Sequence, residues 1–323
     1  MNQSFKVKKL LVVIAITLSM VNGVYARGRA DAAREGATAD KRLSVVSTIF
    51  PPFDFVREIA GERVSRFMLV PPGVESHSFE PTPRDIIRIQ NCDVFIYVGG
   101  ESDVWVERVL SSMDTSKMQI ISLMDCVTVV EEELVEGMEE EEGEEEEAEY
   151  DEHVWTAPRN AQLIVRKISD ALCAADTGNA EAYRANTAAY LAKLDALDAA
   201  FQEVVANGSR HTIVFGDRFP FRYLADAYNL SYFAAFPGCS TETEPSAATL
   251  RFLIDKVRAE HIPVIFHIEL SNERMADMIS EETGAKKLLL HAGHNLSKRE
   301  LEQGRSYLDI MNQNALNLRE ALR

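Results

Sequence analysis

The sequence is short of positive charge. Its 323 residues contain 34 lysines and arginines against 51 aspartates and glutamates, which gives a formal net charge of −17. Nucleic-acid binding requires a basic patch or stripe that neutralises phosphates, and the sequence contains none. We therefore expect no nucleic-acid partner, and the acidic balance favours a cationic ligand.

Cysteine and the common enzyme motifs are also scarce or missing. The four cysteines match no CxxC-type zinc spacing; they are Cys92, Cys126, Cys173 and Cys239. They allow three disulfide pairings, and buried free thiols are an equally good interpretation. A GxxxxGK[ST] phosphate loop, an HExxH helix and a GxSxG elbow are all absent. We assign no catalytic residue and expect a binding protein rather than an enzyme.

Long apolar runs are absent beyond the amino terminus. There, the apolar run Leu10–Val21 follows three lysines and precedes the small-residue cleavage pattern Val24–Ala26. The run is short for a transmembrane helix, which needs roughly 20 apolar residues. Residues 1–26 are therefore predicted to be a cleaved signal peptide, and the mature protein is expected to be periplasmic.

The sequence has an excess of acidic residues in one segment. Fifteen of the twenty-two residues from Glu131 to Glu152 are acidic, and none is basic. Such a run repels itself and has little to bury, so 131–152 is predicted to be a solvated, mobile loop. A solubilising insertion is the plain interpretation. Because the run ends at His153, we interpret it as a cation-gathering loop through Glu139, Glu140, Glu141, Glu142, Glu144, Glu145, Glu146 and Glu147.

The rest of the chain alternates strand and helix patterns. Apolar, β-branched runs such as 43–50 and 93–98 are separated by helical periodicity, which is typical of parallel sheets covered on both faces. The predicted fold class is α/β, with two doubly wound parallel-sheet lobes joined by a long rigid helix. The predicted segments are a first lobe at 27–158, a helical segment at 159–206 that includes the linking helix 179–206, and a second lobe at 207–323.

Histidines and one aspartate follow the predicted strands. His77, Asp217 and His291 each come after a strand, and His153 directly precedes a helix. Ligands of open α/β sheets collect beyond the carboxyl ends of the strands. Three imidazoles and one carboxylate suit zinc. Each residue also has a structural interpretation: a helix cap for His77, a surface position for His153, and a salt bridge for Asp217. His294 is a possible ligand or supporting residue beside His291.

Four segments resemble the metal-binding solute-binding proteins of zinc and manganese ABC importers. They are HSFEPTPRDI from His77, DEHVWTAPRNAQLI from Asp151, ETEPSAATL from Glu242, and GRSYLDIMNQNALNLREAL from Gly304. The resemblance covers nearly the whole mature chain, and an acidic or histidine-rich loop is typical of the zinc branch. It implies a metal site in the cleft between two lobes, with His77 and His153 as the first two ligands.

The resemblance departs from the family pattern at the other two ligands. The segment FGDRFPFRYLA lacks the usual third histidine, and Asp217 is the replacement there. His291 stands where the family usually has an aspartate. Glu80 is a further possible ligand.

The resemblance implies delivery of Zn²⁺ to an inner-membrane ABC permease with its ATPase subunit. We expect the protein to be a monomer. The alternatives are a manganese-binding protein of the same fold and an exported adhesin-like interaction protein.

Overall fold

The computed structural model describes residues 42–138, 149–240 and 246–323. The predicted signal peptide and the run from Glu139 to Glu147 lie outside these residues. Met1–Arg42 and Leu43–Arg323 form two separate units, and the description below concerns the second.

The first sheet has four parallel strands in the order β2-β1-β3-β4. These strands are β1 (Leu43–Ser47), β2 (Val64–Met68), β3 (Val94–Tyr97) and β4 (Gln119–Ser122). Between them lie α2 (Phe50–Ala60), α3 (Pro83–Gln90) and α4 (Val104–Ser111), with short 3-10 turns η1 (Gly61–Arg63) and η2 (Glu101–Asp103). The 3-10 turn η3 (Met124–Cys126) follows β4. We call this sheet and its helices the first lobe.

The second sheet repeats that strand order. It runs β10-β9-β5-β7, so its first strand in the chain again lies between its second and third. Its strands are β5 (Thr212–Phe215), β7 (Ser231–Phe233), β9 (Val264–His267) and β10 (Lys286–Leu289). A two-stranded sheet joins β6 (Arg218–Phe219) to β8 (Phe236–Pro237). The helices are α7 (Arg222–Tyr228), α8 (Ala247–Glu260), α9 (Arg274–Thr283), α10 (Lys298–Glu302) and α11 (Tyr307–Ala321). These elements form the second lobe.

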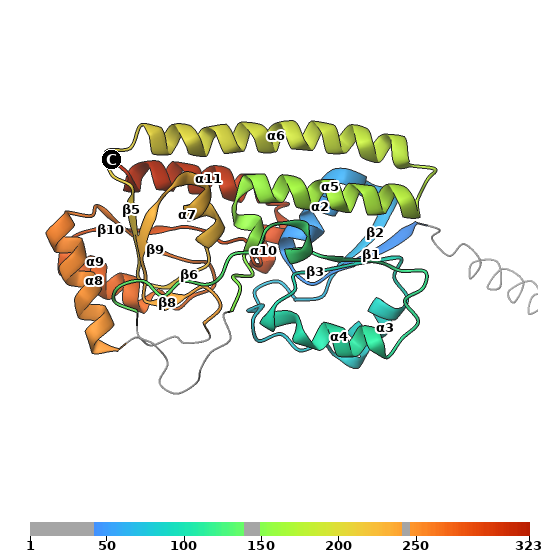
Figure 1. Ribbon diagram of the computed structural model, residues 1–323, viewed down its shortest axis with the longest axis horizontal. Helices are drawn as coiled ribbons and strands as arrows, with labels where there is room; N and C mark the ends of the chain where they lie inside the picture. The colour runs from blue at the N-terminus through green and yellow to red at the C-terminus, as the bar shows by residue number, and fades with distance from the viewer. Residues whose placement is uncertain (1–41, 139–148, 241–245) are drawn as a thin grey trace, which may run out of the picture. The chain divides into compact units, whose positions relative to one another are not determined.

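A layer of long helices covers both sheets. α6 (Ala180–Ala206) has 27 residues and packs against α5 (Pro158–Ala175), α2 and α11 (Figure 1). At ~1.5 Å per residue it is about 40 Å long. Its buried side includes Tyr183, Tyr190, Leu194 and Phe201. The predicted fold class, with a helix that runs along both lobes, agrees with this arrangement.

Local chemistry explains several boundaries. α3 begins at the predicted Pro83 because Thr82 and Asp85 cap it reciprocally: the Thr82 hydroxyl accepts from the Asp85 N–H, and the Asp85 carboxylate accepts from the Thr82 N–H. The predicted strand 43–50 is too long at its end. Phe50 starts α2 instead, and the two following prolines fit a first helical turn, whose N–H groups have no partner within the helix.

The ends of the acidic run are paired with each other, although Glu131 and Glu133 are exposed. Glu131 and Tyr150 form an antiparallel bridge, and the Glu132 N–H donates to the Glu149 carbonyl at 2.8 Å. Asp151 and Glu152 are buried, with exposed fractions of 1% and 3%. Main-chain pairing thus holds the two ends of the predicted loop 131–152, and burial also holds the second end.

All four cysteines are free thiols. The sequence left disulfide pairing and free thiols as alternatives, and the structure has free thiols. Within the described part of the chain, no helix is both long and apolar enough to span a membrane.

Candidate metal site between the lobes

Three histidines from distant parts of the chain meet between the lobes. His77 lies in the loop between β2 and α3, and His153 directly precedes the 3-10 turn η4 (Val154–Thr156). His294 lies in the loop between β10 and α10. Their side chains are 5%, 0% and 8% exposed, respectively. The fold therefore removes all three imidazoles from bulk water at one place.

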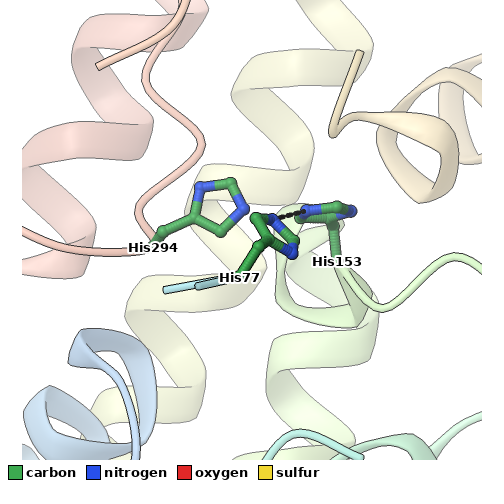
Figure 2. A group of neighbouring side chains, drawn as sticks. All are labelled: His77, His153 and His294. Carbon is green, nitrogen blue, oxygen red and sulfur yellow. Dashed lines mark hydrogen bonds between the residues drawn. The ribbon is translucent and has the colours of Figure 1, made fainter. Parts of the chain in front are cut away.

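The three rings face one another, as Figure 2 shows. Their centroids lie 5.4 Å (His77 to His153), 5.3 Å (His77 to His294) and 4.7 Å (His153 to His294) apart. One nitrogen from each lies within 4.8 Å of the others, a grouping able to hold a metal ion. We call these residues the histidine triad. The Nε2 atoms of His77 and His153 are 3.4 Å apart, too close for both to be protonated without repulsion.

Each ring is oriented through its other nitrogen. Nδ1 of His77 lies 2.8 Å from the Ser102 hydroxyl, Nδ1 of His153 lies 3.0 Å from the Asp151 carboxylate, and Nδ1 of His294 lies 3.2 Å from the Glu269 carboxylate. Metal-bound histidines commonly use their second nitrogen in this way, which fixes the ring and its tautomer. This arrangement leaves the Nε2 atoms of His77 and His153 against each other, and Nε2 of His294 is buried without a hydrogen-bond partner.

Burial and electrostatic repulsion keep the imidazoles of His77 and His153 uncharged. Burial, with repulsion from His294 and His153, lowers the pKa of His77 to about 2. Burial and the neighbouring His294 likewise hold the pKa of His153 well below its ordinary value. Neutral imidazoles have the lone pair that a metal ion requires.

The first lobe holds the loop that carries His294. The His294 carbonyl accepts from the Phe50 N–H at 3.2 Å, and the Leu296 carbonyl accepts from the Gly73 N–H at 2.8 Å. The Asn295 side chain donates to the Pro71 carbonyl at 2.7 Å. These bonds bring a residue of the second lobe against the two histidines of the first.

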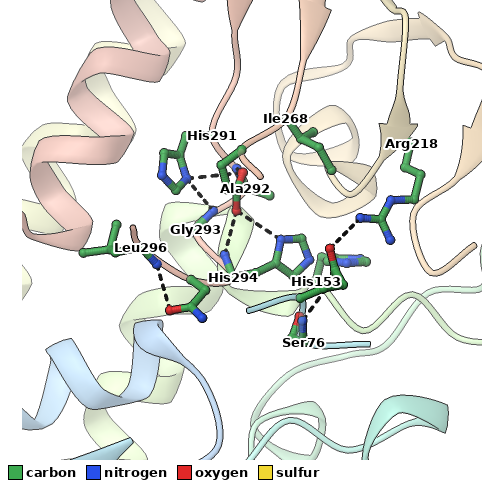
Figure 3. A network of polar contacts seen from close by, with 12 residues as sticks. Ser76, His153, Arg218, Ile268, His291, Ala292, Gly293, His294 and Leu296 are labelled. Atoms are coloured by element: carbon green, nitrogen blue, oxygen red, sulfur yellow. Dashed lines mark hydrogen bonds and ion pairs between the residues drawn. The ribbon is translucent and has the colours of Figure 1, made fainter. Parts of the chain in front are cut away.

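The structure does not bring His291 into the triad. Its N–H donates to the Asn314 side chain at 2.9 Å, which ties it to α11, and its Nδ1 lies 3.3 Å from Glu269 (Figure 3). The residue expected only as a possible or supporting ligand, His294, takes the place expected of His291. The reason is tertiary: Glu269 holds both rings, but only His294 lies in the segment bonded to the first lobe.

Asp217 and Glu80 also lie outside the triad. The two Asp217 carboxylate oxygens accept from the Arg218 N–H at 2.9 Å and the Ile268 N–H at 3.2 Å, so Asp217 ties the ends of β5 and β9 together. Glu80 is exposed. The predicted exchange, with Asp217 as third ligand and His291 as fourth, is therefore not what the geometry shows.

Charged residues that the sequence did not single out surround the triad. Arg218 in the second lobe donates to the Glu75 carboxylate in the first at 2.9 Å. Glu75 has its pKa lowered to about 2 because Arg218 and the nearby histidines outweigh the effect of its burial. Burial opposes ionisation of Glu269, but His291 and His294 hold the Glu269 pKa well below its usual range. Positions directly after strands were the only signal for Arg218 and Glu269.

The family model described as "Zinc-uptake complex component A periplasmic" matches residues 45–321. The chain belongs to this family. Membership confirms the resemblance found in the sequence and places the chain among the components of uptake complexes rather than among enzymes.

Individual relatives agree. The zinc-binding lipoprotein AdcA of Streptococcus pneumoniae is 31% identical over 288 residues, covering 87% of this chain and 56% of AdcA. The chain thus spans about half the length of that relative. The high-affinity zinc uptake system protein ZnuA of Bacillus subtilis is 32% identical over 293 residues, covering 87% and 88% of the two chains. The Zn(II)-bound ZnuA-like domain of Streptococcus pneumoniae AdcA has a TM-score of 0.72 and 29% identity, covering 87% and 99%.

Proposed function

We propose that the chain captures Zn²⁺ outside the cytoplasm in the histidine triad and delivers it to an inner-membrane ABC permease with its ATPase subunit. One observation carries the proposal: each triad histidine has its Nδ1 held by a neighbour, while one nitrogen of each ring lies within 4.8 Å of the others. Names of relatives, "zinc-binding lipoprotein" and "zinc uptake system protein", support the same cargo. After removal of residues 1–26, the protein works in the periplasm.

Zinc fits this set of ligands better than manganese. Nitrogen-rich sites favour zinc, whereas Mn²⁺ is better served by oxygen ligands. The triad offers three imidazole nitrogens. Manganese remains the competing cargo to be tested, since one fold can serve both metals.

Calorimetry on the metal-free protein tests the proposal. We expect one tight equivalent of Zn²⁺ in the wild type and its loss in His153→Ala, because His153 is fully buried in the triad. His211→Ala is the matched control, since His211 is exposed and distant from the triad in the chain. Zinc should also raise the melting temperature more than manganese at equal concentration. Tight zinc binding by His153→Ala, or a stronger effect of manganese, would contradict the proposal.

The acidic run would raise the cation concentration near the triad. Oxygen ligands bind divalent metals less selectively than imidazoles, so the run gathers while the triad discriminates. Replacing the eight glutamates between 139 and 147 by glutamine should leave the tight equivalent intact and slow zinc uptake in a zinc-poor medium. Loss of the tight equivalent would show that the run supplies a ligand of the triad ion.

A further inference from the structure

A thiol lies beside the triad. Cys239 follows β8 in the second lobe, and its N–H donates to the Glu132 carboxylate at 2.8 Å. The preceding Gly238 allows close approach to His153, since a Cβ there would lie 3.1 Å from the imidazole ring. Two further groupings of potential metal ligands, each within 4.8 Å, share this cysteine: His77, Glu152 and Cys239, and Glu132, His153 and Cys239.

The two carboxylates come from the two ends of the acidic run. Glu132 lies on one side of the short antiparallel pairing described above, and Glu152 lies just past its other side. The second lobe supports this pairing, because the Tyr223 hydroxyl donates to the Asp151 carbonyl at 2.7 Å and accepts from the Val130 N–H at 3.3 Å. Cys239 of the second lobe thus lies next to Glu132 and Glu152, where the acidic run begins and ends.

We propose that Cys239 forms a second position for a thiophilic divalent cation beside the triad, together with Glu132 and Glu152, each of which offers an oxygen within 4.8 Å of the Cys239 sulfur. This second position rests on the proposed function, and it adds a transit point for the metal between the acidic run and the triad. The sulfur supplies the soft ligand that zinc accepts, and the carboxylates supply charge and oxygen. Binding would release the thiol proton to the solvent and leave a thiolate on the metal.

The arrangement favours a second position over a fourth ligand for the triad ion. His294 completes the triad grouping but belongs to neither grouping that contains Cys239. A metal on Cys239 would also lie beside Glu132 and Glu152 at the two ends of the acidic run, whereas Glu269 borders His294. Cys239 is half-buried rather than fully enclosed.

A titration with Co²⁺ tests the second position in the mature, reduced full chain, because cobalt bonded to a thiolate shows a charge-transfer band in the near ultraviolet. We expect the first equivalent to bind without this band and the second to produce it. Cys239→Ser should lose the band and the second equivalent but keep the first. Cys126→Ser is the matched control, since Cys126 is also partly exposed, and it should behave as the wild type.

The outcomes separate this proposal from the function on which it rests. Absence of the charge-transfer band with an intact first equivalent would overturn the second position alone. A band that grows with the first equivalent, together with weaker tight binding in Cys239→Ser, would make Cys239 a ligand of the triad ion and also overturn it. Failure of the wild type to bind any tight equivalent would overturn the proposed function.

Loading kinetics test the transit role. In stopped-flow mixing with Zn²⁺, Cys239→Ser and Glu132→Gln should fill the triad several-fold more slowly than the wild type, with unchanged affinity at equilibrium. Equal loading rates in the presence of the second equivalent would show that the position binds metal but lies on no path to the triad.

Discussion

The two lobes share one strand order but supply the triad differently. The first lobe provides His77 and His153, whose partners Ser102 and Asp151 lie in the same lobe. The second provides His294 and holds it through Glu269. Its loop is fixed by bonds to the first lobe, at Phe50, Gly73 and Pro71. The first lobe therefore contains a nearly finished half-site, whereas the half-site of the second depends on contact between the lobes.

That difference has a consequence for motion. Trp155, which packs beside His153 and His294, donates to the Ala292 carbonyl at 2.7 Å, and the Tyr307 hydroxyl donates to the Trp155 carbonyl at 2.6 Å. Wide opening of the lobes would break these buried bonds and leave polar groups without partners. Together with the continuous helix α6, they favour small local movements of the His294 loop over a wide hinge motion.

The largest effect should come from removing the ligand that the second lobe supplies. Four-coordinate structural zinc sites bind with roughly 10–16 kcal/mol, which corresponds to about 3 kcal/mol per ligand. His294→Ala should then raise the Kd for zinc by about 100-fold. His291→Ala, the neighbouring control, should change it far less, because His291 is bonded to Asn314 outside the triad. Calorimetry decides, and the reverse ranking would restore the ligand expected from the sequence.

The next largest losses of zinc affinity should come from replacing the residues that orient the triad histidines. The loss should be greater for the partner in the second lobe than for the partner in the first. Removing a group that orients a metal-bound histidine typically costs about 10–100-fold in affinity. Glu269→Gln should lie near the upper end, since this carboxylate is ionised and accepts from His294 twice. Asp151→Asn should lie near the lower end, because burial raises the pKa of Asp151 to about 7, so less charge is lost. Equal losses in zinc titrations would argue against this electrostatic distinction.

The same contrast explains what the sequence could and could not reveal. α3 was predictable to the residue because Thr82, Pro83 and Asp85 encode its start locally. His77 and His153 were predictable because each lies next to its own element. The choice between His291 and His294 was not, since it depends on which one lies in the loop bonded to the first lobe. No local pattern pointed to Cys239, whose neighbours come from the ends of the acidic run.

Acid should destabilise the metal-free protein through the first lobe. The pKa of His77 is lowered to about 2 by burial and its neighbours, against about 6.5 in the unfolded chain. Its contribution to stability is therefore fully present above pH 6.5 and is lost as the pH falls from there toward 2, by up to about 1.4 kcal/mol per pH unit. Denaturant unfolding gives the free energy of unfolding of the wild type and of His77→Gln at each pH. In the difference between the two proteins, the contributions of the carboxylates that both contain cancel. A difference independent of pH would contradict the neutral, buried imidazole.

The smallest effect should come from the ion pair that joins the lobes beside the triad. Arg218 is a cation near the triad that lowers the pKa of His77 and His153, so it also disfavours a metal ion there. Arg218→Met should tighten zinc binding by a few-fold, because removing about 1 kcal/mol of repulsion corresponds to such a factor. Glu75→Gln, which keeps the cation and removes its anionic partner, should weaken binding to a similar extent. If Arg218→Met weakened zinc binding instead, the contact that the Arg218–Glu75 pair makes between the lobes would matter more than the positive charge of Arg218. The position of His294 would then depend on Arg218 as well as on the bonds of its own loop.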